Sequence, residues 1–269
     1  MEVELPFKYL KTSVTDGVAL VEMARPPVNA FDREMYIEVA RLFSEPDTYL
    51  PNVTAIVLTG QGKHFCGGND LDEFATMTPE NGGERMWRVR EAFFAIQDCP
   101  APVIAAVRGA AVGTGLAVAA SCDFVIAAED ASFGLPELRV GVMGGARHLA
   151  RIAPQPLVRR MFLTSENLPA SEFAAAGGAV VVCPTDRVVD VATAYAAKIA
   201  AHSVPTVRIG KQILNRIETM TIRSGYEFEQ GFTVSLSGAE DSKEALSAFR
   251  ERRKPKFTDL LVPASARSF

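Results

Sequence analysis

Two glycine-rich loops contain the residue types best suited to holding a reacting oxygen atom. The first is TGQGKHFCGGNDL, residues 59–71, and the second is GAAVGTG, residues 109–115. Each follows a short apolar run and leads into a predicted helix start, where backbone N–H groups are unpaired and carry partial positive charge. Glycine also lets the backbone turn tightly and approach a ligand closely. Two such loops at neighbouring strand ends can aim two N–H donors at one oxygen, as in an oxyanion hole for an enolate or a tetrahedral intermediate.

Other functions of glycine loops fit these residues less well. Turn formation alone remains the simpler interpretation of either loop taken by itself. A phosphate-binding P-loop is excluded, because the chain has no G-x-x-x-x-G-K-[ST] motif. The stretch GTGLAV, residues 113–118, imitates a dinucleotide-binding fingerprint only loosely, since its glycine spacing is incomplete. An acidic residue is not clearly placed at the end of the next strand either.

One carboxylate has the setting of an acid or a base. Glu137 lies in FGLPELRVG, residues 133–141, among mostly apolar neighbours, and such surroundings raise the pKa of a carboxyl group towards neutrality. A glutamate exposed beside a proline turn is the alternative interpretation. His148 is a possible second acid/base, although a lone histidine is more often structural. Cys66 is interpreted as a packing residue, because a histidine partner for a nucleophilic thiol is not evident.

The elements that position these residues are predicted from hydrophobic periodicity and turn residues. Strands are expected at residues 8–14, 18–24, 53–60, 101–109 and 123–130, and helices at 32–43, 84–99 and 116–122, with Asp32 as the N-cap of the first. Beyond Gly141 the pattern is mainly helical, with expected helices within 159–165, 169–178, 186–202, 205–223, 226–238 and 241–253. Strands alternating with helices early and helices alone late predict an α/β core, residues 1–200, and a C-terminal helical region, residues 201–269.

The composition is that of an ordinary globular protein. The chain has 269 residues, 48% of them hydrophobic and 22% charged. The net charge of −4 does not indicate a surface for nucleic acid or membrane. The four cysteines are scattered and the three histidines offer no zinc-ligand spacing, so no metal is expected. We expect a cytoplasmic protein, because the sequence shows neither a signal-peptide core nor 18 consecutive apolar residues.

The sequence resembles the enoyl-CoA hydratase/isomerase family, the crotonase superfamily, nearly from end to end. Five segments carry the resemblance in the family's order: RPPVNAFDREM (25–35), GQGKHFCGGNDL (60–71), PVIAAVRGAAVGTG (102–115), CDFVIAAEDASFGLPELRVG (122–141) and AFRERRKPKF (248–257). The resemblance implies an α/β fold, a crotonase-like spiral of ββα units with a C-terminal helical region. It also implies an acyl-CoA substrate, no cofactor beyond the coenzyme A of that substrate, and a homotrimer or a dimer of trimers.

The resemblance assigns roles to particular residues. The family's two oxyanion donors match the backbone N–H groups of Asn69 and Thr114, where the family usually has small residues. Neither residue is proline, so both N–H groups are retained. The residues implied to line the substrate and pantetheine path are Ala30, Gly68, Asp70, Leu71 and Gly113. The residues that match the adenine–phosphate end of coenzyme A, commonly across a subunit boundary, are Phe249 and Arg252.

The sequence departs from the family at one of its two glutamates. Family hydratases use both to add water across a double bond; the second matches Glu137, but the position of the first is Ala117. Ala117 follows Thr114 by three residues, about one helical turn, so its side chain should share a face with that donor. A methyl group cannot transfer a proton. The segment GVMGGARHL, residues 141–149, also departs, because the family commonly has a proline and a longer glycine run there.

These departures leave several reactions open. One carboxylate suits double-bond migration, in which the same group removes and returns a proton. Hydration stays open if His148 or a substrate-bound water supplies the missing function. The segments 144–162 and 226–249 resemble a subset of the superfamily that acts on unusual CoA esters, some by opening rings through C–C hydrolysis. The alternatives are therefore a C–C bond hydrolase opening a cyclic β-keto acyl-CoA, and a non-catalytic acyl-CoA-binding paralogue.

Overall fold

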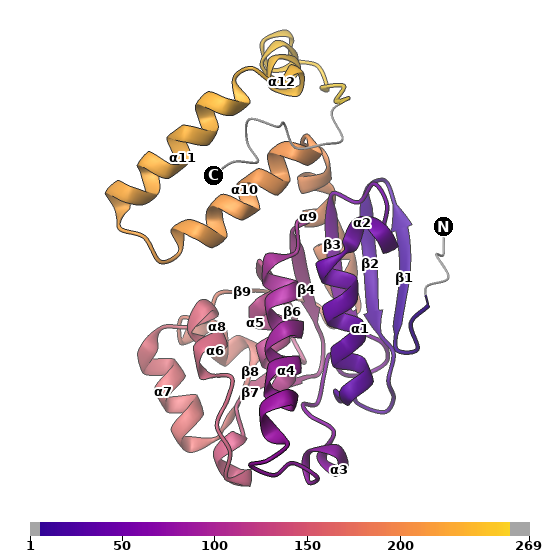
Figure 1. Ribbon diagram of the computed structural model, residues 1–269, viewed down its shortest axis with the longest axis vertical. Helices are drawn as coiled ribbons and strands as arrows, with labels where there is room; N and C mark the ends of the chain where they lie inside the picture. The colour runs from indigo at the N-terminus through magenta and orange to yellow at the C-terminus, as the bar shows by residue number, and fades with distance from the viewer. Residues whose placement is uncertain (1–5, 259–269) are drawn as a thin grey trace.

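A six-stranded sheet forms the centre of the molecule in the computed structural model, which describes residues 6–258 (Figure 1). Its strand order is β1-β2-β3-β4-β6-β9, with β1 and β2 antiparallel and every other neighbouring pair parallel. The strands are β1 (Leu10–Thr15), β2 (Val18–Met23), β3 (Ala55–Gly60), β4 (Val103–Val107), β6 (Phe124–Ala128) and β9 (Val180–Cys183).

The β1–β2 hairpin turns at the two residues that the sequence predicted. Asp16 and Gly17 both have positive φ angles, 48° and 77°, and Thr15 pairs with Val18. Two central residues with positive φ match the twist of the flanking strands, and Asp-Gly is a preferred pair for this turn. The prediction of a hairpin at this point is confirmed.

Helices cover both faces of the central strands. β3 and β4 are buried along their whole length, as expected for parallel strands with both faces covered. α9 (Val188–Ala200) packs against β2, β3, β4 and β6. α1 (Arg33–Ser44) and α4 (Gly82–Asp98) pack against each other in front of the sheet in the view of Figure 1. The predicted N-cap of α1 is confirmed, because Asp32 Oδ1 accepts a hydrogen bond from Met35 N at 2.9 Å.

A second, three-stranded sheet follows the ends of β4 and β6. It pairs β5 (Ala110–Val112) with β7 (Ser132–Gly134) in parallel, and β7 with β8 (Asn167–Pro169) antiparallel. The sequence did not predict these strands, since three residues are too few to show a period. Beyond Gly141, where the pattern predicted mainly helices, the structure also contains β8 and β9, which the sequence analysis did not predict.

The remaining helices are short in the middle of the chain and long at its C-terminal end. The middle ones are α2 (Pro46–Tyr49), α3 (Leu71–Phe74), α5 (Thr114–Ser121), η1 (Glu137–Val140), α6 (Ala146–Ile152), α7 (Gln155–Thr164), α8 (Ala170–Ala175) and η2 (Thr185–Arg187). The C-terminal ones are α10 (Val204–Ile217), α11 (Ile222–Leu236) and α12 (Glu240–Glu251), which form an arm beside the core (Figure 1). The helix expected through Arg223 was too long, because α10 ends at Ile217 and Thr221 caps α11 by accepting from Ser224 N.

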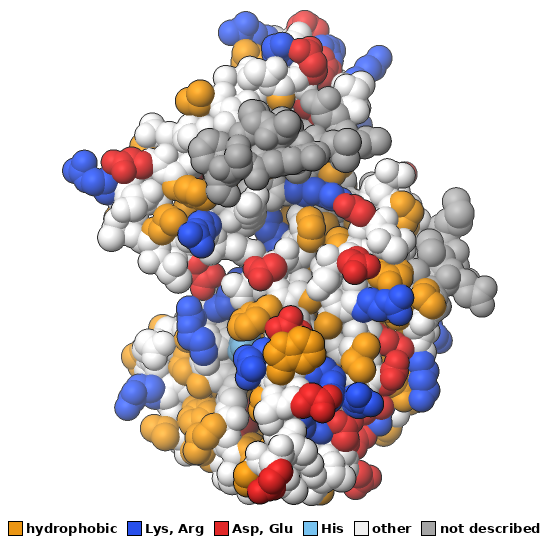
Figure 2. Space-filling view, in the orientation of Figure 1, with side chains coloured by type: hydrophobic (Ala, Val, Ile, Leu, Met, Phe, Trp, Pro, Cys, Tyr) orange, Lys and Arg blue, Asp and Glu red, His pale blue; other side chains and the backbone are white. Residues whose placement is uncertain are grey.

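The arm has a small apolar cluster of its own around Ile209 and Phe232. The break between α9 and α10 falls after Ala200, and a division of the chain into two units at this point stays a prediction. Figure 2 shows cationic and anionic side chains interspersed over the face that it draws. Within residues 6–258, every helix is too short or too polar to cross a bilayer.

Candidate active site

A cavity of about 630 Å³ opens where the two glycine loops meet. Its walls come from the stretches 25–30, 67–74, 112–114 and 136–142, which are far apart in the sequence. The cavity brings together eight of the residues that the sequence predicted for the site: Ala30, Gly68, Asn69, Asp70, Leu71, Gly113, Thr114 and Glu137.

The two glycine loops are joined by backbone hydrogen bonds. Cys66 N donates to Ala110 O at 2.9 Å, and Val112 N donates to Cys66 O at 3.1 Å, which forms a parallel bridge between the loops. Gly115 lets α5 approach this bridge, because a Cβ at Gly115 would stand 2.2 Å from Cys66 O. The first residues of α5 therefore lie directly beside the first loop.

The backbone N–H of Asn69 is free because the segment around Asn69 pairs with Phe31 through the residues on either side of Asn69. Phe31 N donates to Gly68 O and Asp70 N donates to Phe31 O, both at 2.9 Å. In an extended segment, successive N–H groups point to opposite sides. The N–H of Asn69 therefore points away from Phe31, and it has no protein acceptor among residues 6–258.

Thr114 leaves its N–H free for a different reason. It is the first residue of α5, and the first N–H groups of a helix have no partner within the helix. Gly113, just before it, donates its own N–H to Gly134 O at 2.9 Å, whereas Thr114 N has no protein acceptor in the described part of the chain. Both predicted donors therefore line the cavity with their N–H groups unused.

Glu137 faces the same cavity from η1. A Cβ built at Gly113 would stand 3.3 Å from Glu137 Oε1, so the carboxyl group passes close to the start of α5. The Oε2 atom is buried and has no hydrogen-bond partner among the described residues. Burial raises the pKa of the Glu137 carboxyl above its ordinary value. A carboxylate whose pKa is raised is a stronger base than an ordinary glutamate, which suits it to accept and return a proton.

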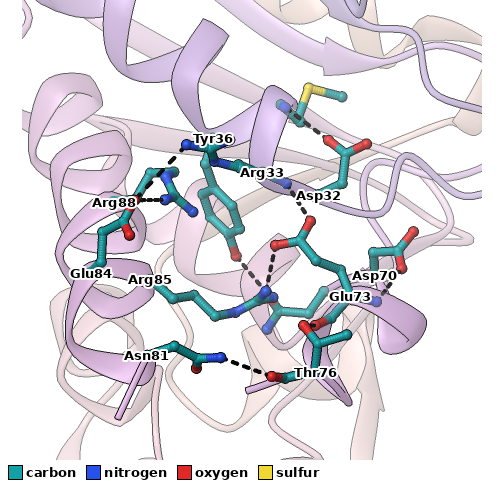
Figure 3. Close-up of polar contacts among 12 residues, drawn as sticks. Asp32, Arg33, Tyr36, Asp70, Glu73, Thr76, Asn81, Glu84, Arg85 and Arg88 are labelled. Carbon is teal, nitrogen blue, oxygen red and sulfur yellow. Dashed lines mark hydrogen bonds and ion pairs between the residues drawn. The ribbon is translucent and has the colours of Figure 1, made fainter. Parts of the chain in front are cut away.

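A network of polar contacts fixes the wall formed by α3 (Figure 3). Asp70 caps this helix, since Asp70 Oδ1 accepts from Glu73 N at 3.0 Å. The Glu73 carboxylate accepts hydrogen bonds from Arg33 N and from the Arg85 guanidinium. Figure 3 shows Glu73, Arg85 and Tyr36 converging between α1, α3 and α4. The first glycine loop, which leads into α3, is thus held to two long helices of the core.

Tyr36 is a site residue that the sequence reasoning missed. Its hydroxyl lies 2.7 Å from Asn69 Oδ1 and 2.8 Å from Thr114 Oγ1, so it contacts both donor residues. The sequence signal is weak: a tyrosine on the apolar face of a helix predicts core packing, and a buried hydroxyl needs a partner that the sequence does not name.

Three other candidate residues lie outside the cavity lining. Ala117 is buried in α5, with 2% of its surface exposed. Cys66 is fully buried, and burial raises the pKa of its thiol to about 12, as expected of a packing residue. His148 packs its ring edge-on against Phe93, with ring centroids 5.0 Å apart, and burial together with the neighbouring Arg151 lowers its pKa to about 4. The structure therefore does not bring His148 to Glu137 as a second acid/base in the cavity.

Phe249 and Arg252 also lie away from the cavity of their own chain. Both belong to the end of α12, in the arm, whereas α3 lies at the opposite end of the molecule (Figure 1). The Phe249 side chain is 83% exposed. Their contact with coenzyme A across a subunit boundary stays a prediction.

Comparison with known proteins agrees with this geometry. A family model described as enoyl-CoA hydratase/isomerase matches residues 13–260. The (7aS)-7a-methyl-1,5-dioxo-2,3,5,6,7,7a-hexahydro-1H-indene-carboxyl-CoA hydrolase of Rhodococcus jostii (strain RHA1) is 34% identical over 257 residues, which cover 91% of this chain and 96% of that protein. The 2,3-dehydroadipyl-CoA hydratase of Escherichia coli (strain K12) is 32% identical over 248 residues, which cover 89% and 94%. The solved structure of Pseudomonas aeruginosa DspI superposes with a TM-score of 0.87 at 31% identity, covering 93% of this chain and 97% of that one.

Proposed function

Since the chain belongs to the enoyl-CoA hydratase/isomerase family, we propose that it converts an acyl-CoA thioester through an enolate held by Asn69 and Thr114, with Glu137 moving the proton. The family's fold is also confirmed: an α/β structure of the crotonase type with helices at the C-terminal end. The enolate, the roles of Asn69, Thr114 and Glu137, and the reaction that follows all belong to the proposal.

The observation that supports the proposal is that Glu137 and two unused N–H groups line the same cavity. The carboxyl group has a buried oxygen without a partner, and Asn69 N and Thr114 N have no protein acceptor within residues 6–258. An oxygen that gains negative charge between two fixed donors is stabilised, and losing one such donor typically costs about 3–4 kcal/mol. A thioester carbonyl is the group in an acyl-CoA that gains this charge when its neighbouring carbon loses a proton.

Double-bond migration uses these groups and no second carboxylate. The Glu137 carboxylate removes a proton from the α-carbon of a 3-enoyl-CoA, and the electron pair delocalises onto the thioester oxygen and the double bond. The two N–H groups hold that oxygen. Glu137 then returns the proton to the γ-carbon, which leaves a 2-enoyl-CoA. A single group with a pKa above that of an ordinary glutamate suits both steps.

A second candidate reaction is favoured by two relatives. The hydrolases of bicyclic dioxo carboxyl-CoA compounds from Rhodococcus jostii and Mycobacterium tuberculosis are 34% and 33% identical to this chain. On a cyclic β-keto acyl-CoA, water would add to the ring ketone and the adjacent C–C bond would break. The Glu137 carboxylate would take a proton from the attacking water. The electron pair of the broken bond would become the thioester enolate, whose oxygen the two N–H groups would hold, and Glu137 would then give its proton to the α-carbon.

A substrate panel tests the proposal. The purified protein is incubated with 2-enoyl-, 3-enoyl- and cyclic β-keto-CoA compounds in H₂¹⁸O and in D₂O, and products are identified by mass spectrometry. Migration leaves the mass unchanged in H₂¹⁸O, and in D₂O it introduces deuterium when the Glu137 carboxyl exchanges its proton with solvent before returning it. Ring opening adds one water and places ¹⁸O in a new carboxylate. Binding of every ester without any product would favour the non-catalytic paralogue and overturn the proposal.

The assembly is part of the same proposal. We infer that Phe249 and Arg252 complete the coenzyme A site of a neighbouring subunit in a homotrimer or a dimer of trimers. The 83% exposure of Phe249 at the end of α12 supports a role outside its own chain. Light scattering on the purified protein measures the mass of the assembly, and a monomer with full activity would exclude this arrangement.

A further inference from the structure

We propose that the Tyr36 hydroxyl is a positioning group that fixes the two backbone N–H donors of the site relative to each other. It does so by bonding the side chains of both donor residues, Asn69 and Thr114. The inference rests on the proposed function, because it matters only if those N–H groups hold a reacting oxygen.

The three side chains form one hydrogen-bonded chain. Tyr36 lies on α1, Asn69 in the first glycine loop and Thr114 at the start of α5, so three separate segments meet at one hydroxyl. A phenol has a single proton, and the Asn69 Oδ1 atom can only accept. The Tyr36 proton therefore goes to Asn69 at 2.7 Å, and the Thr114 hydroxyl donates to the Tyr36 oxygen at 2.8 Å.

This side-chain contact adds a constraint to the backbone hydrogen bonds that join the two loops. Gly67 and Gly68 precede Asn69, and Gly113 precedes Thr114, with Gly68 and Gly113 at positive φ angles of 116° and 56°. Glycine permits the close approach of these loops but leaves the backbone conformationally free. An oxyanion site is effective only when its donors are fixed before charge develops. The hydroxyl of Tyr36 fixes the residue that follows each glycine stretch, Asn69 in the first loop and Thr114 in the second.

Tyr36 itself is firmly held. Only 1% of its surface is exposed, and its ring packs edge-on against Phe31 and Phe93, with centroids 4.9 Å and 6.2 Å away. Phe31 also pairs with Asn69 through the backbone, so the residue that packs on the Tyr36 ring is joined to the loop that Tyr36 contacts. Burial raises the pKa of the Tyr36 hydroxyl, which keeps it protonated, and the residue does not line the cavity. Its effect on the reaction therefore passes through Asn69 and Thr114.

A chromophoric thioester gives the direct test. The absorbance of 4-(dimethylamino)cinnamoyl-CoA moves to longer wavelength when its carbonyl oxygen accepts hydrogen bonds, because the excited state places more charge on that oxygen. We expect a red shift on binding to the parent protein and a smaller shift with Tyr36→Phe, while the dissociation constant changes little. On a substrate found with the panel, kcat should fall about tenfold at nearly constant KM, less than the loss of a whole donor.

Two further variants separate positioning from packing. Tyr49→Phe is the matched control. Tyr49 is also a buried tyrosine, 7% exposed, but it lies in α2 and its ring packs against Phe7. The Tyr49→Phe variant should keep the full red shift. In an Asn69→Ala, Thr114→Ala background both N–H groups remain but the side-chain bonds are gone. Adding Tyr36→Phe to that background should have no further effect on the shift.

Each outcome has one meaning. A full red shift and unchanged kcat in Tyr36→Phe overturn the inference and leave the proposed function intact. An equal additional loss in the double-alanine background also overturns it, because Tyr36 would then act by packing alone. No red shift in the parent protein overturns the oxyanion proposal together with this inference. If Tyr36→Phe fails to fold, Thr114→Val is the substitute. It removes the hydroxyl that donates to Tyr36 but keeps the backbone N–H of residue 114, and it should show a partial loss of the red shift.

Discussion

Arg25 Nη2 lies 2.6 Å from Asp70 Oδ2, and this ion pair joins the loop after β2 to the start of α3. The same guanidinium contacts Asp32 Oδ2 through Nε at 3.0 Å and donates to Ala30 O at 3.0 Å. The other Asp70 oxygen accepts from Glu73 N at 3.0 Å. The carboxylate of Asp70, the residue after Asn69, is therefore held by a contact at each of its two oxygens. The sequence suggested only that Asp70 lines the substrate path.

Replacing Asp70 should separate its two contacts. Asp70→Ala removes both the helix cap and the ion pair, and we expect a loss of about 1–2 kcal/mol in the free energy of unfolding. Asp70→Asn keeps an acceptor for Glu73 N and loses only the ion pair, so its loss should stay below about 1 kcal/mol. Urea denaturation measures both variants. Equal losses would show that the ion pair, and not the cap, is the main contribution of Asp70.

Glu137→Gln tests the proposed acid/base. The amide keeps the shape of the side chain but cannot take up a proton, so turnover should fall roughly 10²–10⁴-fold. Binding of the CoA ester, measured by calorimetry, should survive, because the N–H groups of Asn69 and Thr114 are unchanged. Turnover close to that of the parent protein on its true substrate would remove Glu137 from the mechanism.

The raised pKa of Glu137 also predicts how activity and stability depend on pH. The base form is required, so kcat/KM should fall on acidification at a pH above 4.5, the ordinary value for glutamate. Below that value the carboxyl is protonated in both folded and unfolded chains; above its folded pKa, burial of the charge lowers stability. Glu137→Gln should therefore raise the melting temperature more at pH 8 than at pH 4. A stabilisation independent of pH would mean that the carboxyl is not desolvated.

The parts of the structure that depend on local sequence were predicted well. The Asp16-Gly17 turn, the Asp32 cap and the central strands are determined by residues within a few positions of each other. The break between α10 and α11 was predicted too late in the sequence, because helix-forming residues continue through it and only Thr221 marks the new start. The strands β5, β7 and β8 were missed because each has three residues and exists only through pairing.

In the candidate site, too, features set by local sequence were predicted and features set by distant contacts were not. The glycine pattern indicated two facing loops, and the family resemblance identified Asn69, Thr114 and Glu137 within them. The role of Tyr36 could not be predicted, because its hydroxyl meets residues 33 and 78 positions away and an apolar helix face predicts only burial. His148 looked chemically suited but lies against Phe93, a contact that depends on the packing of α6 on the core.

His148 should affect stability and not catalysis. Its pKa is lowered to about 4, from an ordinary value of 6.5, by burial and by Arg151 and Arg147. Above pH 6.5 the ring is neutral in both states; between pH 6.5 and 4 the unfolded chain binds a proton that the folded chain does not, so stability falls. His148→Phe keeps a ring against Phe93 but cannot titrate, so its melting temperature should fall less over this range. Its kcat at pH 8 should match the parent protein; a large loss would restore His148 as an acid/base.

The last prediction concerns the carboxylate that the chain lacks. Ala117 lies one turn after Thr114 on α5, and helical side chains lean towards the N-terminus of their helix, which here is the end at the cavity. The longer side chain of Ala117→Glu should therefore reach towards Thr114 and face Glu137. Two carboxyl groups can divide the work of hydration, one activating water and the other supplying the α-proton. We expect Ala117→Glu to hydrate crotonyl-CoA measurably, against weak or no activity in the parent protein.

Folding and charge must be separated in this experiment, because position 117 is only 2% exposed. A larger side chain in a packed core costs about 1–3 kcal/mol, which lowers the melting temperature by roughly 2–4 °C per kcal/mol in a chain of this size. Ala117→Gln has the same bulk without the acid, so it should show the same melting temperature loss and gain no hydration. Two outcomes would contradict this prediction: hydration by Ala117→Gln equal to that by Ala117→Glu, and fast hydration of crotonyl-CoA by the parent protein. Either would mean that another group already supplies the function assigned to the missing glutamate.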